Sequence, residues 1–166
     1  FDYTKNEKMP KVIVINKIDA DNIDLKELLK SIKETFGSQC QVANLPSADS
    51  KSVIDCIEND SGDSPVEDVA TAHTDLIESV IEADDELMEA YLGGEEITSD
   101  KIASVFVKAL ESDTLIPIVF TNAREEVGIT ELLDIITKYT PSPAQAEAEK
   151  LYNDEEETEL KADANG

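Results

Sequence analysis

The sequence predicts an α/β fold built on a parallel β-sheet. Two short apolar runs, residues 11–15 and 115–120, are each followed by a polar loop and then by apolar residues at helical spacing. A strand, a loop and a helix in that order form the repeating unit of a parallel sheet. The carboxyl ends of parallel strands meet at one edge, where open α/β folds bind ligands. We therefore expect the two polar loops to share a ligand.

The first unit begins with the strand at residues 11–15. This run is rich in β-branched residues and is bounded by Pro10 and Asn16, which is typical of a strand covered on both faces. A helix is predicted next, because apolar side chains recur every three or four residues up to Gly37, a residue that commonly ends helices. These side chains are Leu25, Leu28, Leu29, Ile32 and Phe36.

Two weaker strand candidates follow, at residues 41–45 and 52–57. Pro46 is expected to end the first, because proline lacks the N–H that a strand ladder uses. Residues 59–65 consist of turn-forming residues, so no regular structure is predicted there.

Helices are predicted for the next part of the chain. Residues 66–92 fit one or two helices with an apolar side and an acid-rich side, ended by Gly93 and Gly94. Thr98 is a candidate N-cap for a further helix that runs to Leu110. Any insert between the two strand units should therefore be mostly helical.

The second unit consists of the strand at residues 115–120, the loop Thr121-Asn122-Ala123 and a last helix. The apolar side of that helix is predicted to hold Ile129, Leu132, Leu133, Ile136 and Tyr139. Beyond Pro143 the composition changes to Ala, Glu, Asp and Lys, which is typical of a solvated linker or a disordered segment.

The chain is strongly acidic, with a formal net charge of −24. Residues 52–100 contain no Lys or Arg but sixteen Asp and Glu. This charge argues against nucleic acid or an anionic membrane as a direct partner. Two interpretations of the acidic segment stay open: a solvated surface, or a docking surface for a basic partner.

Neither a membrane span nor a metal site is predicted. No apolar run approaches the roughly 20 residues of a membrane helix, and the first residues lack a signal-peptide pattern. Cys40 and Cys56 have no metal-ligand spacing and are too few for a disulfide framework. Two reduced thiols in a cytoplasmic protein are expected.

The tetrad Asn16-Lys17-Ile18-Asp19 directly follows the first predicted strand. A carboxylate in this position can accept hydrogen bonds from the two donors on the pyrimidine edge of guanine, which adenine lacks. A site built on such bonds discriminates between the bases by roughly 10⁴ to 10⁵. The alternative is that Asn and Lys are ordinary turn residues after a strand.

With these motifs the chain resembles the translational GTPases, and most closely elongation factor G and its paralogues. Three blocks carry the resemblance: residues 14–19, residues 86–96 (Glu-Leu-Met-Glu-Ala-Tyr-Leu-Gly-Gly-Glu-Glu) and residues 116–143. Many GTPase families share the Asn-Lys-x-Asp tetrad, whereas the middle block looks particular to elongation factor G. A role in protein biosynthesis is implied.

The resemblance implies a site for GTP or GDP. Asp19 would accept from guanine N1 and the exocyclic amine, Asn16 would tie its loop to the phosphate-binding loop, and Lys17 would lay its stem against the base. A second family loop, Gly-Ser-Ala, offers a backbone N–H to guanine O6. It aligns with Thr121-Asn122-Ala123, where only Ala123 matches; alternatively, these residues merely connect strand to helix. Arg124 would either flank the base or pair with neighbouring glutamates.

Other family motifs are absent from this sequence: the Gly-x-x-x-x-Gly-Lys-Ser/Thr phosphate loop, the Thr that binds Mg²⁺, and the Asp-x-x-Gly switch. Family order places them before residue 1, so we expect the C-terminal half of a P-loop GTPase domain, a three-layer α/β/α fold with a mostly helical insert. Residues 1–39 and 114–143 would belong to that domain, 40–113 to a reduced insert, and 144–166 to an acidic linker. The chain alone is not expected to hydrolyse GTP, and Mg²⁺ is expected only in the whole protein.

Partners are also implied by the resemblance. In the whole protein, GTP hydrolysis would drive a step on the ribosome, with translocation as the family default. The family's insert contacts the C-terminal domain of the ribosomal stalk protein, and the acidic residues at helical spacing that would form this surface are Asp75, Glu78, Glu82, Glu86 and Glu89. Two alternatives remain: a ribosomal-protection or release-factor GTPase, and an acidic docking module whose nucleotide binding has decayed.

Overall fold

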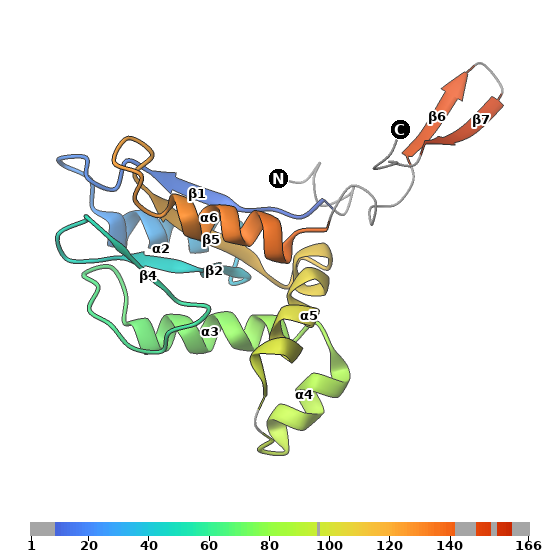
Figure 1. The fold of residues 1–166 in the computed structure, drawn as a ribbon, viewed down its shortest axis with the longest axis horizontal. Coiled ribbons are helices and arrows are strands. Elements are labelled where there is room, and N and C mark those ends of the chain that lie inside the picture. The colour runs from blue at the N-terminus through green and yellow to red at the C-terminus, as the bar shows by residue number, and fades with distance from the viewer. Residues whose placement is uncertain (1–8, 96, 142–148, 154–155, 161–166) are drawn as a thin grey trace.

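The structure is a computed structural model that describes residues 9–95, 97–141, 149–153 and 156–160. Its strands are β1 (Ile13–Asn16), β2 (Cys40–Val42), β3 (Asn44–Pro46), β4 (Val53–Asp55), β5 (Ile116–Thr121), β6 (Glu149–Asn153) and β7 (Glu156–Leu160). Its helices are α2 (Leu25–Phe36), α3 (Val69–Ile81), α4 (Asp85–Leu92), α5 (Ser99–Glu111) and α6 (Ile129–Asp134), the last continued by the π-helical segment η1 (Ile135–Tyr139) (Figure 1). None of the described helices is long and apolar enough to cross a membrane.

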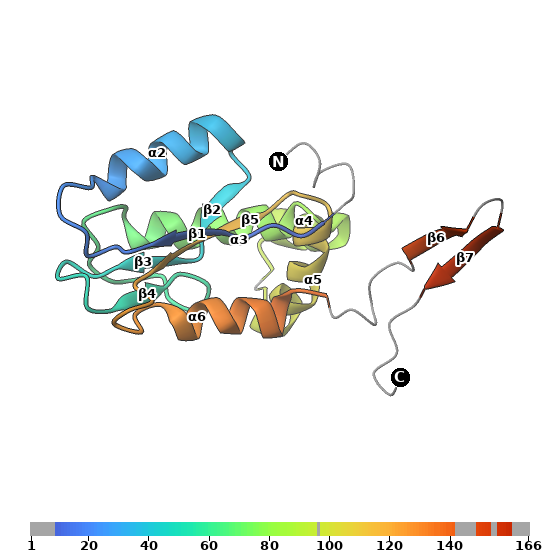
Figure 2. The same ribbon diagram turned by 90° about the horizontal axis from the view of Figure 1, so that it is seen from above.

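A three-stranded parallel sheet in the order β1-β5-β2 forms the centre of the fold. All six residues of β5 are buried, because strands flank this strand on both sides and helices cover the sheet. Figure 2 shows α2 on one side of the sheet and α6 on the other. The predicted α/β fold, with a parallel sheet between layers of helices, is therefore confirmed.

Strand β1 is less covered than its apolar sequence predicts. Ile15 is 7% exposed in the main core, and Val12 packs with Val119 and Ile135 on the opposite face. Val14 points to that same opposite face but is 46% exposed, because β1 is an edge strand and the α6 side does not cover its carboxyl end. The prediction that both faces are covered is wrong at this position.

The predicted strand at residues 41–45 is two strands in different sheets. β2 pairs with β5 in parallel, whereas β3 pairs with β4 in antiparallel. The change of partner takes place at Ala43, whose N–H still donates to the Ile118 carbonyl at 2.9 Å. Pro46 was expected to follow the last residue of the strand. It is itself the last residue of β3, where it pairs with Val53. The sequence of this run does not reveal the switch, because Val42 and Leu45 are equally buried on the two sides of it.

Residues 66–92 form two helices, α3 and α4, as one of the two expectations held. Each begins at an aspartate N-cap: Asp68 accepts from the Thr71 N–H and Asp84 from the Leu87 N–H. α3 packs along β2 and against α5. A second core of fully buried side chains joins α3 and α5 and includes Leu76 and Phe106.

The last helix follows a different pattern from the one predicted. Ile135 is 2% exposed, whereas the predicted core positions Leu133 and Ile136 are 53% and 47% exposed. Leu132, Ile135 and Tyr139 pack on the core instead, at the ordinary helical spacing of three and four residues. The exposed Leu133 comes before the π-helical segment η1 begins, so the buried side is set by the element that packs against this helix. Tyr139 then stacks on Phe106 of α5, with ring centroids 4.3 Å apart, and so joins this helix to the helical insert.

The predicted linker contains an antiparallel hairpin in its described part, with Glu149 opposite Leu160 and Asn153 opposite Glu156. Local charge composition predicted no strand there, so the hairpin was missed. The proposed boundary at residues 39 and 40 stays a prediction, although β2 is paired with the main sheet. Cys40 and Cys56 are buried free thiols, and burial raises the pKa of Cys56 to about 12, which keeps it protonated.

We predict that the Asp84 N-cap gives the fold an acid-sensitive contribution. The Lys108 ammonium, whose Nζ lies 2.7 Å from Oδ2, and the Leu87 N–H hold the pKa of Asp84 below its ordinary value. A lowered folded-state pKa stabilises the fold above the unfolded-state pKa, and this contribution is lost as the pH falls through the folded-state pKa. Asp84→Ala should therefore lower the melting temperature by a few degrees at neutral pH and by less in acid.

Thermal unfolding between neutral pH and pH values below the carboxyl range measures this difference. The control is Glu89→Ala, which removes the same charge from the exposed side of α4. If the difference in melting temperature between Asp84→Ala and the unsubstituted chain does not shrink in acid, the acid-sensitive role of the Asp84 N-cap is contradicted.

Candidate functional site

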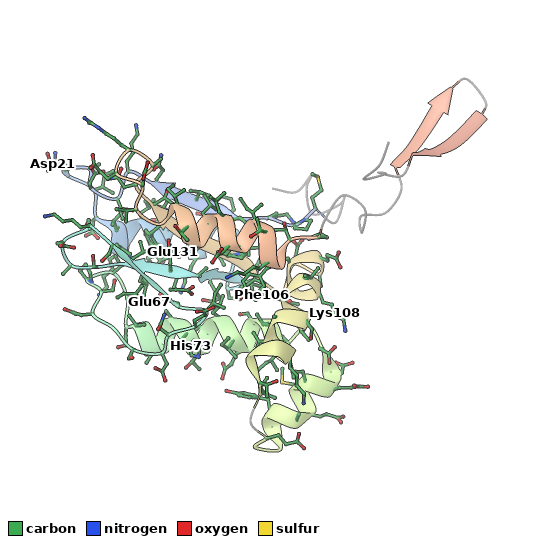
Figure 3. All side chains as sticks on the ribbon, in the orientation of Figure 1. Asp21, Glu67, His73, Phe106, Lys108 and Glu131 are labelled. Atoms are coloured by element: carbon green, nitrogen blue, oxygen red, sulfur yellow. The ribbon has the colours of Figure 1, made fainter. Side chains whose placement is uncertain are left out.

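The two polar loops predicted to share a ligand lie side by side at the carboxyl edge of the sheet. β1 and β5 run in parallel, with Asn16 directly opposite Thr121. Figure 1 shows the loops after both strands at the same end of the molecule. In Figure 3, Asp21 marks this end, and Phe106 and Lys108 lie toward the other.

Asn16 ties the loops together through its side-chain carbonyl. Its Oδ1 accepts from the Ala123 backbone N–H at 3.0 Å and from the Thr121 hydroxyl at 3.3 Å. The resemblance assigned Asn16 to a contact with a phosphate-binding loop. In this structure its carbonyl oxygen holds the second polar loop against the first, and the contact with a phosphate-binding loop stays a prediction.

The tetrad turns sharply after β1. Lys17 has a φ of +64°, a left-handed conformation that costs a residue other than glycine about 1–2 kcal/mol. The turn is closed by the Ala20 N–H, which donates to the Lys17 carbonyl at 3.0 Å. Ile18 anchors it, because its side chain is 5% exposed and its N–H donates to the Thr121 carbonyl. Lys17 and Asp19 are left exposed on the outer side.

The second loop presents one small residue to the same surface. Thr121 and Asn122 are buried, whereas Ala123 is exposed. The Asn122 and Val127 backbones exchange two hydrogen bonds of 2.8 and 3.1 Å, which close the loop between them. A base oxygen that reaches the Ala123 N–H must share it with Asn16 or replace Asn16.

Arg124, for which two roles were open, lies beside Glu125 with Nε 3.8 Å from Oε1. Its side chain is 90% exposed, so this ion pair contributes little stability.

Gly128 packs closely against the end of β5, where the second loop begins. It was not identified from the sequence as a residue of the site. It has a φ of +72° and precedes α6. A Cβ at this position would lie 2.2 Å from the Phe120 carbonyl oxygen, which is a severe overlap. At position 128, directly before α6, only glycine therefore fits against the Phe120 carbonyl.

Asn44 was also not identified from the sequence. It is fully buried, and its side-chain amide bonds to the backbone of Phe120, the residue before the second loop. The signal was present, because a lone asparagine stands among buried apolar neighbours from Val42 to Leu45.

The acidic residues of the predicted docking surface fall on two helices. Asp75 and Glu78 of α3 and Glu82 at its C-cap line a cavity of about 320 Å³ beside β2. Glu86 and Glu89 lie exposed on α4. The Tyr91 hydroxyl donates to Glu78 at 3.2 Å, which links the two helices. Among the described residues, no group of three or more His, Cys, Asp or Glu side chains is placed to hold a metal ion.

A parallel sheet with helices on both faces (Figure 2) is similar to the fold of a P-loop GTPase domain. The chain belongs to the family described as the elongation factor Tu GTP binding domain, whose profile matches residues 1–142. The predicted resemblance to translational GTPases is thereby confirmed.

Two relatives extend this result. The chain is 30% identical over 163 residues to elongation factor G 1 of Synechocystis sp. (strain ATCC 27184 / PCC 6803 / Kazusa), an alignment that covers 86% of this chain and 24% of that protein. It is also similar to a crystal structure from Thermus thermophilus, with a TM-score of 0.72, 26% identity and coverage of 86% and 24%. The chain thus spans about a quarter of the length of these relatives.

We predict that Gly128→Ala destabilises the chain well beyond the cost of its backbone conformation. A methyl group there must displace the Phe120 carbonyl, which should add roughly 1–3 kcal/mol to the strain of a left-handed alanine. Denaturant unfolding measures the free energy of unfolding.

Gly94→Ala is the matched control, since Gly94 has a similar φ of +77° but no atom within 4 Å of the place that a Cβ would take. Equal losses in the two variants would show that the close approach to Phe120 is unimportant.

Proposed function

We propose that this chain recognises the guanine base of GTP and GDP within a translational GTPase of the elongation factor G type. The observation that carries the proposal is the pair of hydrogen bonds from the second loop to Asn16 Oδ1. They hold the loop of Ala123 against the loop that carries the exposed carboxylate of Asp19. One surface then offers an acceptor for two base donors and a backbone donor that a base oxygen would share with Asn16 or take over from it.

The residues present fit guanine in their chemistry. Asp19 accepts from N1–H and the exocyclic amine, the Ala123 N–H donates to O6, and the aliphatic stem of Lys17 covers the ring. Adenine presents an acceptor at N1 and a donor at position 6, so both contacts would be mismatched. Mismatched polar groups are what give a hydrogen-bonding site its selectivity.

In the whole protein we propose that GTP hydrolysis drives a step on the ribosome, with translocation as the default. The family membership and the similarity to elongation factor G 1 support this role. Hydrolysis needs groups that bind the phosphates and Mg²⁺, and this sequence contains none of the family motifs that supply them. The part played by this chain is therefore binding and selection of the base.

The test of guanine recognition is an exchange of base specificity. In the unsubstituted chain, GDP should shift the backbone NMR signals of residues 16–20 and 121–124, and ADP should not. Asp19→Asn replaces one acceptor by a donor, which suits the C2 carbonyl of xanthine instead of the amine of guanine. We expect this variant to favour XDP over GDP by about 100-fold or more relative to the unsubstituted chain.

Asp21→Asn serves as the control, because it removes the same charge from the exposed loop outside the tetrad. Equal shifts with GDP and ADP, or an unchanged preference in Asp19→Asn, would refute guanine recognition. The acidic surface would then be the place to look for function.

We further propose that the acidic surface of α3 and α4 docks the C-terminal domain of the ribosomal stalk protein. The support is the charge of this segment, where Asp75, Glu78 and Glu82 gather around one cavity without a neighbouring cation among the residues that line it. Such a surface attracts a basic partner and speeds its association.

Charge reversal tests this docking. Glu82→Lys combined with Glu86→Lys should weaken binding of the isolated stalk domain by about tenfold and reduce its dependence on salt. Calorimetry at two salt concentrations provides the measurement. The control reverses Glu27 and Glu34 on α2, and a similar loss there would show that only net charge matters.

A further inference from the structure

Asn44 lies where the chain leaves the main sheet. Its backbone pairs with Asp55 of β4, while its side chain turns toward β5 and is fully buried. The Phe120 N–H donates to Asn44 Oδ1 at 2.7 Å, and Asn44 Nδ2 donates to the Phe120 carbonyl at 3.2 Å.

These two bonds continue the β2–β5 ladder by one step. Backbone pairing on this side of β5 ends where the Ala43 N–H meets the Ile118 carbonyl. The next position of the ladder belongs to Phe120, but the backbone of Asn44 has already turned away. An amide side chain has the same donor and acceptor as a peptide group, so it can take the vacant place.

Phe120 immediately precedes the second base loop. From the next residue onward the contacts belong to the site: the Thr121 carbonyl accepts from Ile18, and the Thr121 hydroxyl and Ala123 N–H both donate to Asn16. Asn16 therefore holds the loop from the β1 side, and Asn44 holds its root from the β2 side.

We infer that Asn44 is a positioning residue for guanine binding: by pairing with the Phe120 backbone it sets the place of the Ala123 N–H that faces the base oxygen. This inference rests on the proposed function of the site. Asn44 itself does not reach the surface, and it belongs to β3, which leads into the insert. The insert and the base loop are thus joined by one buried amide.

The position of Asn44 determines which contact with the base should weaken when Asn44 is replaced. The Ala123 side faces O6, which guanine and hypoxanthine share, whereas Asp19 faces the exocyclic amine, which hypoxanthine lacks. Loss of Asn44 should weaken the binding of GDP and of inosine diphosphate by the same factor. Loss of Asp19 should instead reduce the difference between them.

The experiment compares Asn44→Leu, which keeps the branching and the number of heavy atoms but removes both hydrogen bonds, with Leu45→Ala, a substitution at the adjacent fully buried residue of β3. Amide hydrogen exchange of residues 120–123 is measured by NMR without nucleotide, under conditions where both chains are folded. We expect exchange to rise about tenfold in Asn44→Leu alone. Affinities for GDP and inosine diphosphate should both fall about three- to tenfold, with an unchanged ratio.

Exchange at residues 120–123 that rises equally in Leu45→Ala would overturn the inference and leave Asn44 as a core residue only. If the unsubstituted chain binds neither nucleotide, the proposed function fails, whereas the exchange comparison still decides whether Asn44 holds the loop.

Discussion

The pairing of β5 on both of its edges is the constraint on which the rest of the structure depends. This strand is buried along its whole length, so each of its backbone groups needs a partner within the protein. β1 serves one edge, and β2 followed by the Asn44 side chain serves the other. A buried peptide group without a partner would cost about 1–3 kcal/mol, which is a large share of the stability of a small domain.

The geometry of the site follows from this constraint. Because β1 and β5 are in register, their last residues are opposite each other and Asn16 can hold both loops with one oxygen atom. The surrounding packing is strong enough to keep Lys17 in a left-handed conformation and to leave no room for a side chain at Gly128. Local strain of this kind persists only where the scaffold over-determines it.

The helical insert is attached to the rest of the fold at two places. Asn44 joins the end of β5 through a polar contact, and Tyr139 stacks on Phe106 of α5 at the far end of the last helix. Both contacts are buried or partly buried, whereas most acidic side chains on the outer surface of α3 and α4 are exposed to solvent. The insert therefore combines a fixed attachment to the main sheet with an exposed acidic surface.

The sequence by itself determined the α/β class, most of the helices and the place of the Asn-Lys-x-Asp tetrad directly after a strand, because periodicity, caps and a short motif are local properties. It could not reveal the switch of partner at Ala43 or the burial of Ile135 in place of Leu133 and Ile136, since each depends on which element packs alongside. Likewise Asn44 and Gly128 gain their roles from Phe120, a residue far away in the sequence or separated by a loop. Only the tertiary structure decided these points, because a hydrogen-bond partner or a steric limit exists only once distant segments have been brought together.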